Sequence, residues 1–192
     1  MLENFEGDIN LENFHTLSKS TKWIIFNERF DIVEKIVKDQ ISPKRYAHSQ
    51  SVARVCVSLA KRWHFDEQLA YQAGILHDVT KSLSKEEHLA YLNYYDPSKV
   101  DDPEPILHSY SAKYFIKDKF NYYNKDVLNA IYHHTDGESN AVLAKILYIA
   151  DKREPLRGLD PTLLNLAYED LTLAFNLLKE DVKEYVKNNH GK

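Results

Sequence analysis

Apolar residues recur every three to four positions along most of the chain, a spacing that predicts amphipathic helices. The first expected helix covers residues 23–41, with Ile25 and Ile32 on one face. Residues 1–25 have no clear period and carry polar clusters, so we expect them to form a partly ordered extension. The main domain is then expected to cover residues 26–192.

Capping residues predict where several further helices begin. Ser42 followed by Pro43 is typical of an N-cap with proline in the first turn, and Ser84 with Glu87 forms a capping-box pattern. The other expected helices cover residues 42–63, 66–78, 104–120, 124–135 and 137–152, with one from residue 84 and a long final helix from residue 160. No sustained strand pattern or internal repeat interrupts them, which predicts a single all-α domain, a bundle of seven to nine helices.

Composition narrows the class of protein. The chain has 192 residues with 43% hydrophobic and 28% charged content, which is typical of one globular domain with a sizeable core. A single cysteine, Cys56, excludes an internal disulfide and any metal site built from several cysteines. The net charge of −4, with acids and bases interspersed, argues against a broad nucleic-acid surface. With neither a signal-peptide pattern nor an apolar run of about 20 residues, we expect a cytoplasmic protein that binds no membrane.

Histidines and acidic residues lie on the apolar faces of the expected helices. His48 lies four residues before Val52, and His134 lies four residues after Ala130. An unpaired buried imidazole or carboxylate is costly, whereas several that converge can bind a divalent transition metal. The candidate metal ligands are His48, His77, Asp78, His108, His134 and Asp151.

Each of these residues also has an ordinary structural interpretation when it is taken singly. A lone histidine on an apolar face is more often a hydrogen-bonded core residue than a ligand. Asp78 could be a helix-terminal acid that faces solvent, and Asp151 could pair with Lys152 or Arg153. The joint pattern of six residues from successive helices is far more specific, and it favours the metal site.

Side chains near the candidate ligands could bind phosphate groups. Lys81 follows the His-Asp pair by one turn, and Arg45 precedes His48 by one turn. Arginine offers a planar fork and lysine a point charge to phosphate, although either could be an ordinary surface cation. Thr135 and Gly137 could line a substrate loop or simply form a turn. The candidate substrate-binding residues are Arg45, Lys81, Thr135, Gly137 and Arg157.

These motifs resemble the HD-domain phosphohydrolase superfamily, which is named for a His-Asp pair, present here as His77-Asp78. The resemblance is closer still to its YqeK group, the bacterial symmetrical diadenosine tetraphosphate hydrolases. The matching segments are residues 45–49, 73–81, 106–109, 134–137 and 149–157. Asp136 stands where the family commonly has threonine, and Arg153 stands where an apolar residue is usual.

The resemblance implies an HD-domain helical bundle with two divalent metal ions, iron being favoured and manganese or cobalt being substitutes. The ligands would form two sets that share Asp78: His48, His77, Asp78 and Asp151 for one ion, and Asp78, His108 and His134 for the other. It implies symmetrical cleavage of diadenosine tetraphosphate into two ADP by a metal-bridged hydroxide, with Asp78 and Lys81 as catalytic residues. A homodimer is also consistent with the family.

Two alternatives remain open from the sequence. The same HD chemistry could serve a phosphatase or phosphodiesterase that acts on another nucleotide. The chain could instead be a nucleotide-binding regulatory module with a decayed site, although the complete ligand set argues against decay. The products formed from a small panel of nucleotides would separate these functions.

Overall fold

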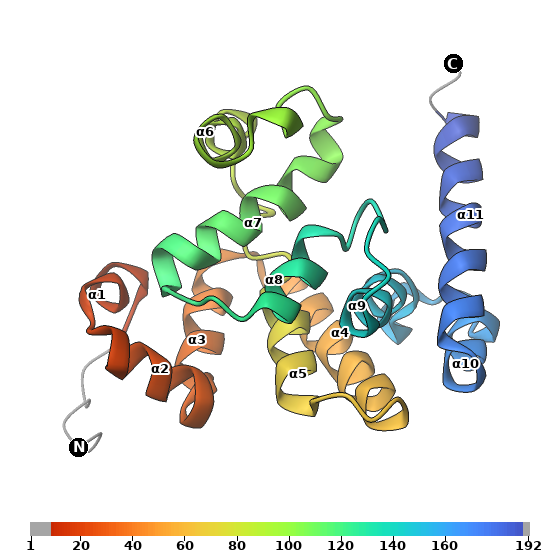
Figure 1. Ribbon diagram of the computed structural model, residues 1–192, viewed down its shortest axis with the longest axis horizontal. Coiled ribbons are helices and arrows are strands. Elements are labelled where there is room, and N and C mark those ends of the chain that lie inside the picture. Colours follow the sequence, from red (N-terminus) through yellow and green to blue (C-terminus); the bar gives the residue numbers. More distant parts are fainter. Residues whose placement is uncertain (1–8, 190–192) are drawn as a thin grey trace.

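The computed structural model describes residues 9–189, which form α-helices and two short 3-10 helices without any strand in this part of the chain (Figure 1). The first six α-helices are α1 (Leu11–Thr16), α2 (Lys19–Glu28), α3 (Phe30–Gln40), α4 (Pro43–Arg62), α5 (Glu67–Leu76) and α6 (Lys85–Tyr95). They are followed by η1 (Pro97–Lys99), α7 (Glu104–Phe120), α8 (Lys125–Tyr132), α9 (Val142–Arg153), η2 (Pro155–Arg157), α10 (Thr162–Glu169) and α11 (Leu171–Asn189). The all-α prediction is confirmed.

The expected number of helices was too low, because the described residues contain 11 α-helices rather than seven to nine. The expected helix 23–41 divides at Arg29, whose backbone leaves the helical region and whose side chain pairs with Asp31 at 2.9 Å. The expected final helix divides at Asp170, which has an extended backbone and accepts the N–H of Leu173 at 2.9 Å. Neither break is marked by glycine or proline.

Two helices occupy the segment that we expected to be a partly ordered extension. Asn10 caps α1 through a capping box, and Phe14 on that helix has no exposed surface. Its ring packs edge-on against Phe26 of α2 and Phe120 of α7. The expected boundary at residue 25 therefore falls inside α2, while residues 1–8 lie outside the described part of the chain.

The predicted starts of three helices are confirmed by hydrogen bonds. Ser42 accepts the N–H of Arg45 ahead of Pro43 in the first turn of α4. Asp66 caps α5 in the same way, and Ser84 caps α6 through a complete capping box. These caps satisfy backbone N–H groups that have no partner within the helix, so they determine where each helix begins.

The centre of the molecule is formed by α4, α5, α8 and α9, with α7 crossing beside α8 (Figure 1). The helices α4 and α5 approach one another closely at Gly74, where an added Cβ would lie 2.4 Å from the Cα of Ala53. Only glycine allows such an approach of two helix backbones. This contact brings His48 on α4 and His77 at the end of α5 to the same region of the core.

Within the described residues, no helix combines the length and the apolar character that a membrane span requires.

Candidate metal centre

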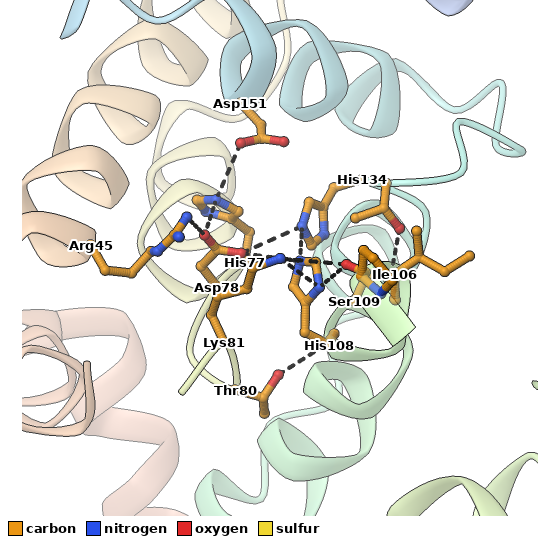
Figure 2. A network of polar contacts seen from close by, with 12 residues as sticks. Arg45, His77, Asp78, Thr80, Lys81, Ile106, His108, Ser109, His134 and Asp151 are labelled. Atoms are coloured by element: carbon orange, nitrogen blue, oxygen red, sulfur yellow. Dashed lines mark hydrogen bonds and ion pairs between the residues drawn. The ribbon is translucent and has the colours of Figure 1, made fainter. Parts of the chain in front are cut away.

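The six predicted ligands come together where the central helices meet. His48 comes from the second turn of α4, and His77 and Asp78 directly follow α5. The others are His108 in α7, His134 just beyond α8 and Asp151 in the last turn of α9. Figure 2 shows the side chains of His77, Asp78, His108, His134 and Asp151 pointing toward one another. Four of the six are buried: His77, Asp78, His108 and His134.

Asp78 stands between two groups of imidazoles. Its Oδ1 lies 3.2 Å from Nε2 of His108 and 3.7 Å from Nε2 of His134. Its Oδ2 lies 3.5 Å from Nε2 of His77 and 4.0 Å from Nε2 of His48. Atoms that bind one ion at about 2.1 Å lie about 3 to 3.5 Å apart, so the spacing in each group is close to that of metal ligands. Two groups of side chains could therefore each hold an ion, with Asp78 common to both.

Asp151 joins the first of these groups. Its Oδ1 lies 3.1 Å from Nε2 of His48 and 3.8 Å from Nε2 of His77. The side chain is 14% exposed, which leaves one edge of the group open toward the surface. A site with such an opening can admit water or substrate, unlike a closed structural metal site.

The environment of His77 indicates that these residues fit a divalent ion. Its Nδ1 bonds to the carbonyl of Gly74 at 2.8 Å, but its Nε2 is buried with no hydrogen-bond partner among the described residues. A buried nitrogen without a partner is costly, and this one faces Asp78 and Asp151. Imidazole nitrogens and carboxylate oxygens are donors that suit iron, manganese, cobalt or zinc.

Burial and mutual contact favour the protonation states that metal binding needs. Burial lowers the pKa of His77 and of His108 to about 4, so both imidazoles are neutral near pH 7. Burial opposes the ionisation of Asp78, but the facing imidazoles of His77, His108 and His134 hold its pKa well below its usual range. His77 and His108 therefore offer neutral imidazoles beside an ionised carboxylate, as metal ligation requires, whereas contacts with Asp151 and Glu154 outweigh burial and raise the pKa of His48.

Three predicted phosphate-binding cations lie at the same centre. Nη1 of Arg45 is 2.8 Å from Oδ2 of Asp78, and Nη2 of Arg157 is 3.0 Å from Oδ1 of Asp151. Nζ of Lys81 is 3.0 Å from Nδ1 of His108. A cavity of about 580 Å³ opens beside Arg45 and Arg157 and is lined by Ser42, Lys44, Arg45, Ala47, His48, Glu154, Leu156, Arg157 and Leu159.

The two predicted residues of the substrate loop have different surroundings. Oγ1 of Thr135 is 2.7 Å from Oγ of Ser109, and Thr135 directly follows His134. Gly137 is buried with φ +64°, and a Cβ there would lie 2.9 Å from the ring of Tyr148. Its carbonyl accepts from Lys179, and none of these contacts joins it to the ligand groups. The positive φ of this turn explains why glycine occupies position 137.

The two departures from the family pattern have local partners. Asp136 accepts from Nδ1 of His133 at 2.9 Å and from the hydroxyl of Tyr110 at 3.3 Å. Arg153 lies 3.7 Å from Asp181 of α11. Asp136 therefore belongs to the loop beside His134, whereas Arg153 ties α9 to α11.

Two further residues support the centre: Lys152, which the sequence suggested only as a partner of Asp151, and Glu154, to which the sequence assigned no role. Nζ of Lys152 donates to the carbonyl of His134 at 2.7 Å and to Asp151 at 3.4 Å. Glu154 is 2% exposed, and its Oε1 accepts from Nδ1 of His48 at 3.1 Å. Glu154 follows Asp151 by three residues but ends α9 with an extended backbone, so no local spacing in the sequence connects it with His48 on α4.

Comparison with known proteins identifies the family. The HD domain model matches residues 45–156, a segment that contains all six candidate ligands. The chain belongs to the HD domain family. HD domains bind divalent metals, and the two groups around Asp78 are where this member could hold them. The chain is accordingly an HD-type hydrolase.

Curated relatives and a solved structure agree with this assignment. The chain is 33% identical over 130 residues to a symmetrical bis(5'-nucleosyl)-tetraphosphatase of Halalkalibacterium halodurans, covering 64% of this chain and 67% of the relative. It is 32% identical over 170 residues to a probable nicotinate-nucleotide adenylyltransferase/Ap4A hydrolase of Mycoplasma pneumoniae, covering 81% of this chain but only 48% of that relative. The chain thus spans about half the length of the Mycoplasma protein.

The solved structure is described as a predicted HD superfamily hydrolase involved in NAD metabolism, from Clostridium acetobutylicum. It is 30% identical in sequence and superimposes with a TM-score of 0.78 over 85% of this chain and 89% of the other. The HD fold therefore extends over most of the described helices.

Proposed function

We propose that this HD domain protein cleaves diadenosine tetraphosphate symmetrically into two molecules of ADP. The observation that carries the proposal is the position of Asp78, whose two carboxylate oxygens face separate groups of imidazoles. Relatives at 33% identity that are named symmetrical bis(5'-nucleosyl)-tetraphosphatases support this substrate.

The residues would hold two divalent ions, iron in the first place, with manganese or cobalt as substitutes. One ion would be held by His48, His77, Asp78 and Asp151, and the other by Asp78, His108 and His134. Such ions supply an activated water and withdraw electrons from the phosphoryl group. The cytoplasmic location and the homodimer stay predictions.

The chain's own cations would bind the polyphosphate. A tetraphosphate carries several negative charges, and a protein with net charge −4 must concentrate positive charge locally to bind it. Arg45 and Arg157 both line the cavity beside His48, and each is held in place by one of the acidic ligands. Their guanidinium groups can exchange part of these contacts for phosphate oxygens.

Lys81 would act at the second group of ligands. Its Nζ lies 3.0 Å from the ring of His108, close enough to stabilise negative charge that develops on a phosphoryl oxygen beside that histidine. Burial lowers the pKa of Lys81, while Asp78 acts in the opposite direction. We therefore assign Lys81 to transition-state stabilisation and Asp78 to holding the two halves of the centre together.

The test is product analysis with a panel of nucleotides. The protein would be purified without chelator under reducing, anaerobic conditions and incubated separately with diadenosine tetraphosphate, ATP, ADP and cyclic AMP. ADP as the sole product of diadenosine tetraphosphate supports the proposal, whereas AMP with ATP indicates asymmetric cleavage and contradicts it. Preferential hydrolysis of a mononucleotide or a cyclic nucleotide would favour the alternative HD-type phosphatase or phosphodiesterase.

An Asp78→Ala variant, measured in the same experiment, tests whether the two groups of ligands share Asp78. Because Asp78 is common to both groups of ligands, the variant should lose bound metal and hydrolysis together. Full activity of this variant would refute the shared-ligand arrangement. Bound metal without turnover in the unchanged protein would instead favour a nucleotide-binding regulatory module.

A further inference from the structure

All four histidines of the centre turn Nε2 inward and bond Nδ1 to an acceptor outside the centre. For three of them the acceptor is a backbone carbonyl three residues earlier: Gly74 for His77 at 2.8 Å, Pro105 for His108 at 2.9 Å and Ile131 for His134 at 2.7 Å. A carbonyl can only accept, so at His77 and His134 these bonds place the proton on Nδ1 and leave the lone pair of Nε2 for a metal. At His108 the Pro105 carbonyl favours the same tautomer, although Nζ of Lys81 also lies 3.0 Å from that Nδ1.

His48 is the exception among the four, because its Nδ1 bonds to a side chain instead of a carbonyl of its own helix. The acceptor is Oε1 of Glu154, 106 residues later in the chain and 3.1 Å away. On the other side of the ring, Nε2 lies 3.1 Å from Oδ1 of Asp151. On its Nδ1 side the ring of His48 is therefore held by the carboxylate of Glu154, while the rings of the other three histidines are held there by backbone carbonyls.

Glu154 is itself held firmly. It is 2% exposed, and its Oε2 accepts the backbone N–H of Leu156 at 2.7 Å. That bond caps η2, the turn that carries Leu156 and Arg157 along the wall of the cavity beside His48. One carboxylate thus joins a candidate metal ligand to the turn that would contact substrate.

We infer that Glu154 is a positioning residue that fixes the ring of His48 for metal binding through Oε1 and fixes the substrate-side turn through Oε2. The part of the inference that concerns the substrate-side turn rests on the proposed function. The part that concerns the orientation of His48 does not depend on the substrate. A carboxylate partner on an imidazole ligand fixes the tautomer and makes the ligand more basic, and removal of such a partner weakens metal binding about 10- to 100-fold.

Glu154→Gln is the informative variant because it keeps the shape of the side chain. If the amide oxygen faces His48, the amide NH₂ faces the N–H of Leu156, and the cap of η2 is lost. If the amide is reversed, its NH₂ faces Nδ1 and forces the proton of His48 onto Nε2, which cannot then bind metal. Either arrangement impairs one of the two functions that we assign to Glu154.

The experiment measures Mn²⁺ affinity by calorimetric titration of the metal-free full chain, together with kcat and KM for diadenosine tetraphosphate at saturating Mn²⁺. For Glu154→Gln and Glu154→Ala we expect Mn²⁺ to bind about 10- to 100-fold more weakly, or KM to rise at saturating metal, with circular dichroism unchanged. Glu138→Gln is the control, since Glu138 is 64% exposed and pairs with Lys179. Mn²⁺ affinity and KM both within twofold of the unsubstituted protein would overturn the inference.

A measurement on the unsubstituted chain keeps the inference testable if both variants fail to fold. In metal-free protein with ¹⁵N-labelled histidine, long-range ¹H–¹⁵N spectra should show the neutral His48 ring protonated at Nδ1. A neutral ring protonated at Nε2 would overturn the inference. Failure to hydrolyse diadenosine tetraphosphate would contradict the proposed function but would leave both the Mn²⁺ affinities and the tautomer as valid tests of Glu154.

Discussion

Replacing Gly74 by alanine tests the helix contact on which the centre is built. The new Cβ would lie 2.4 Å from Cα and 2.7 Å from N of Ala53, both of them backbone atoms of α4. Carbon atoms in contact prefer about 3.5 to 4.0 Å, and no side-chain rotation can relieve a clash with backbone. The helices α4 and α5 must therefore move apart by roughly 1 Å.

The expected loss of stability in Gly74→Ala is the difference between two opposing effects. Overpacking of a tight core costs about 1 to 3 kcal/mol, and a clash with backbone belongs at the upper end. Alanine in place of glycine within a helix returns about 1 kcal/mol through its higher helix propensity. We expect the free energy of unfolding to fall by about 2 kcal/mol, which corresponds to a Tm lower by about 4 to 8 °C for a chain of this size.

Thermal unfolding of the metal-free protein, followed by circular dichroism, measures this change, and Mn²⁺ titration measures its effect on the centre. Because α4 carries His48 and α5 leads into His77, Mn²⁺ affinity should fall as well. Gly158→Ala is the control: Gly158 has φ +64° and nothing within 4 Å, so it should cost only about 1 kcal/mol of backbone strain. A Gly74→Ala variant as stable as the parent would refute the close backbone contact.

Two other predictions concern pH and phosphate binding. The stability of the metal-free protein should fall as pH drops from about 6.5 to 4, because unfolded histidines take up protons that folded His77 and His108, with pKa values lowered to about 4 by burial, do not. His48 does not add to this loss, because its contacts with Asp151 and Glu154 outweigh burial and raise its pKa. Urea titrations that give a flat profile would contradict the assignment. Lys81→Ala should lower kcat/KM for diadenosine tetraphosphate by about 100-fold while Mn²⁺ remains bound, with Lys85→Ala as the exposed control. Unchanged kinetics would show that Lys81 is only a surface cation.

Much of the fold could be predicted because its signals are local. The caps at Ser42, Asp66 and Ser84 act within one helical turn, and the structure contains all three bonds. The divisions at Arg29 and Asp170 lack a glycine or proline, so short-range patterns did not indicate them. The place of Phe14 in the core depends on Phe120, more than 100 residues away, and no local period could reveal that contact.

The candidate metal centre could likewise be predicted only where its signals are local in the sequence. Five of the six candidate ligands were found because each lies on the apolar side of an expected helix, and Asp78 was found because it is adjacent to His77; the structure brings all six together. Glu154 was missed because its role depends on the approach of α9 to α4, which sequence spacing does not describe. Gly137 was expected either to line a substrate loop or to form a turn, and the structure places it in a turn beside Tyr148 and Lys179.

The most direct test of the central claim is to locate metal ions in crystals of the protein grown with Mn²⁺, by anomalous diffraction. The account predicts two peaks that share Asp78 as a ligand. One should contact His48, His77 and Asp151, and the other His108 and His134. A single ion that does not contact Asp78, or no ion at these residues at saturating Mn²⁺, would contradict it.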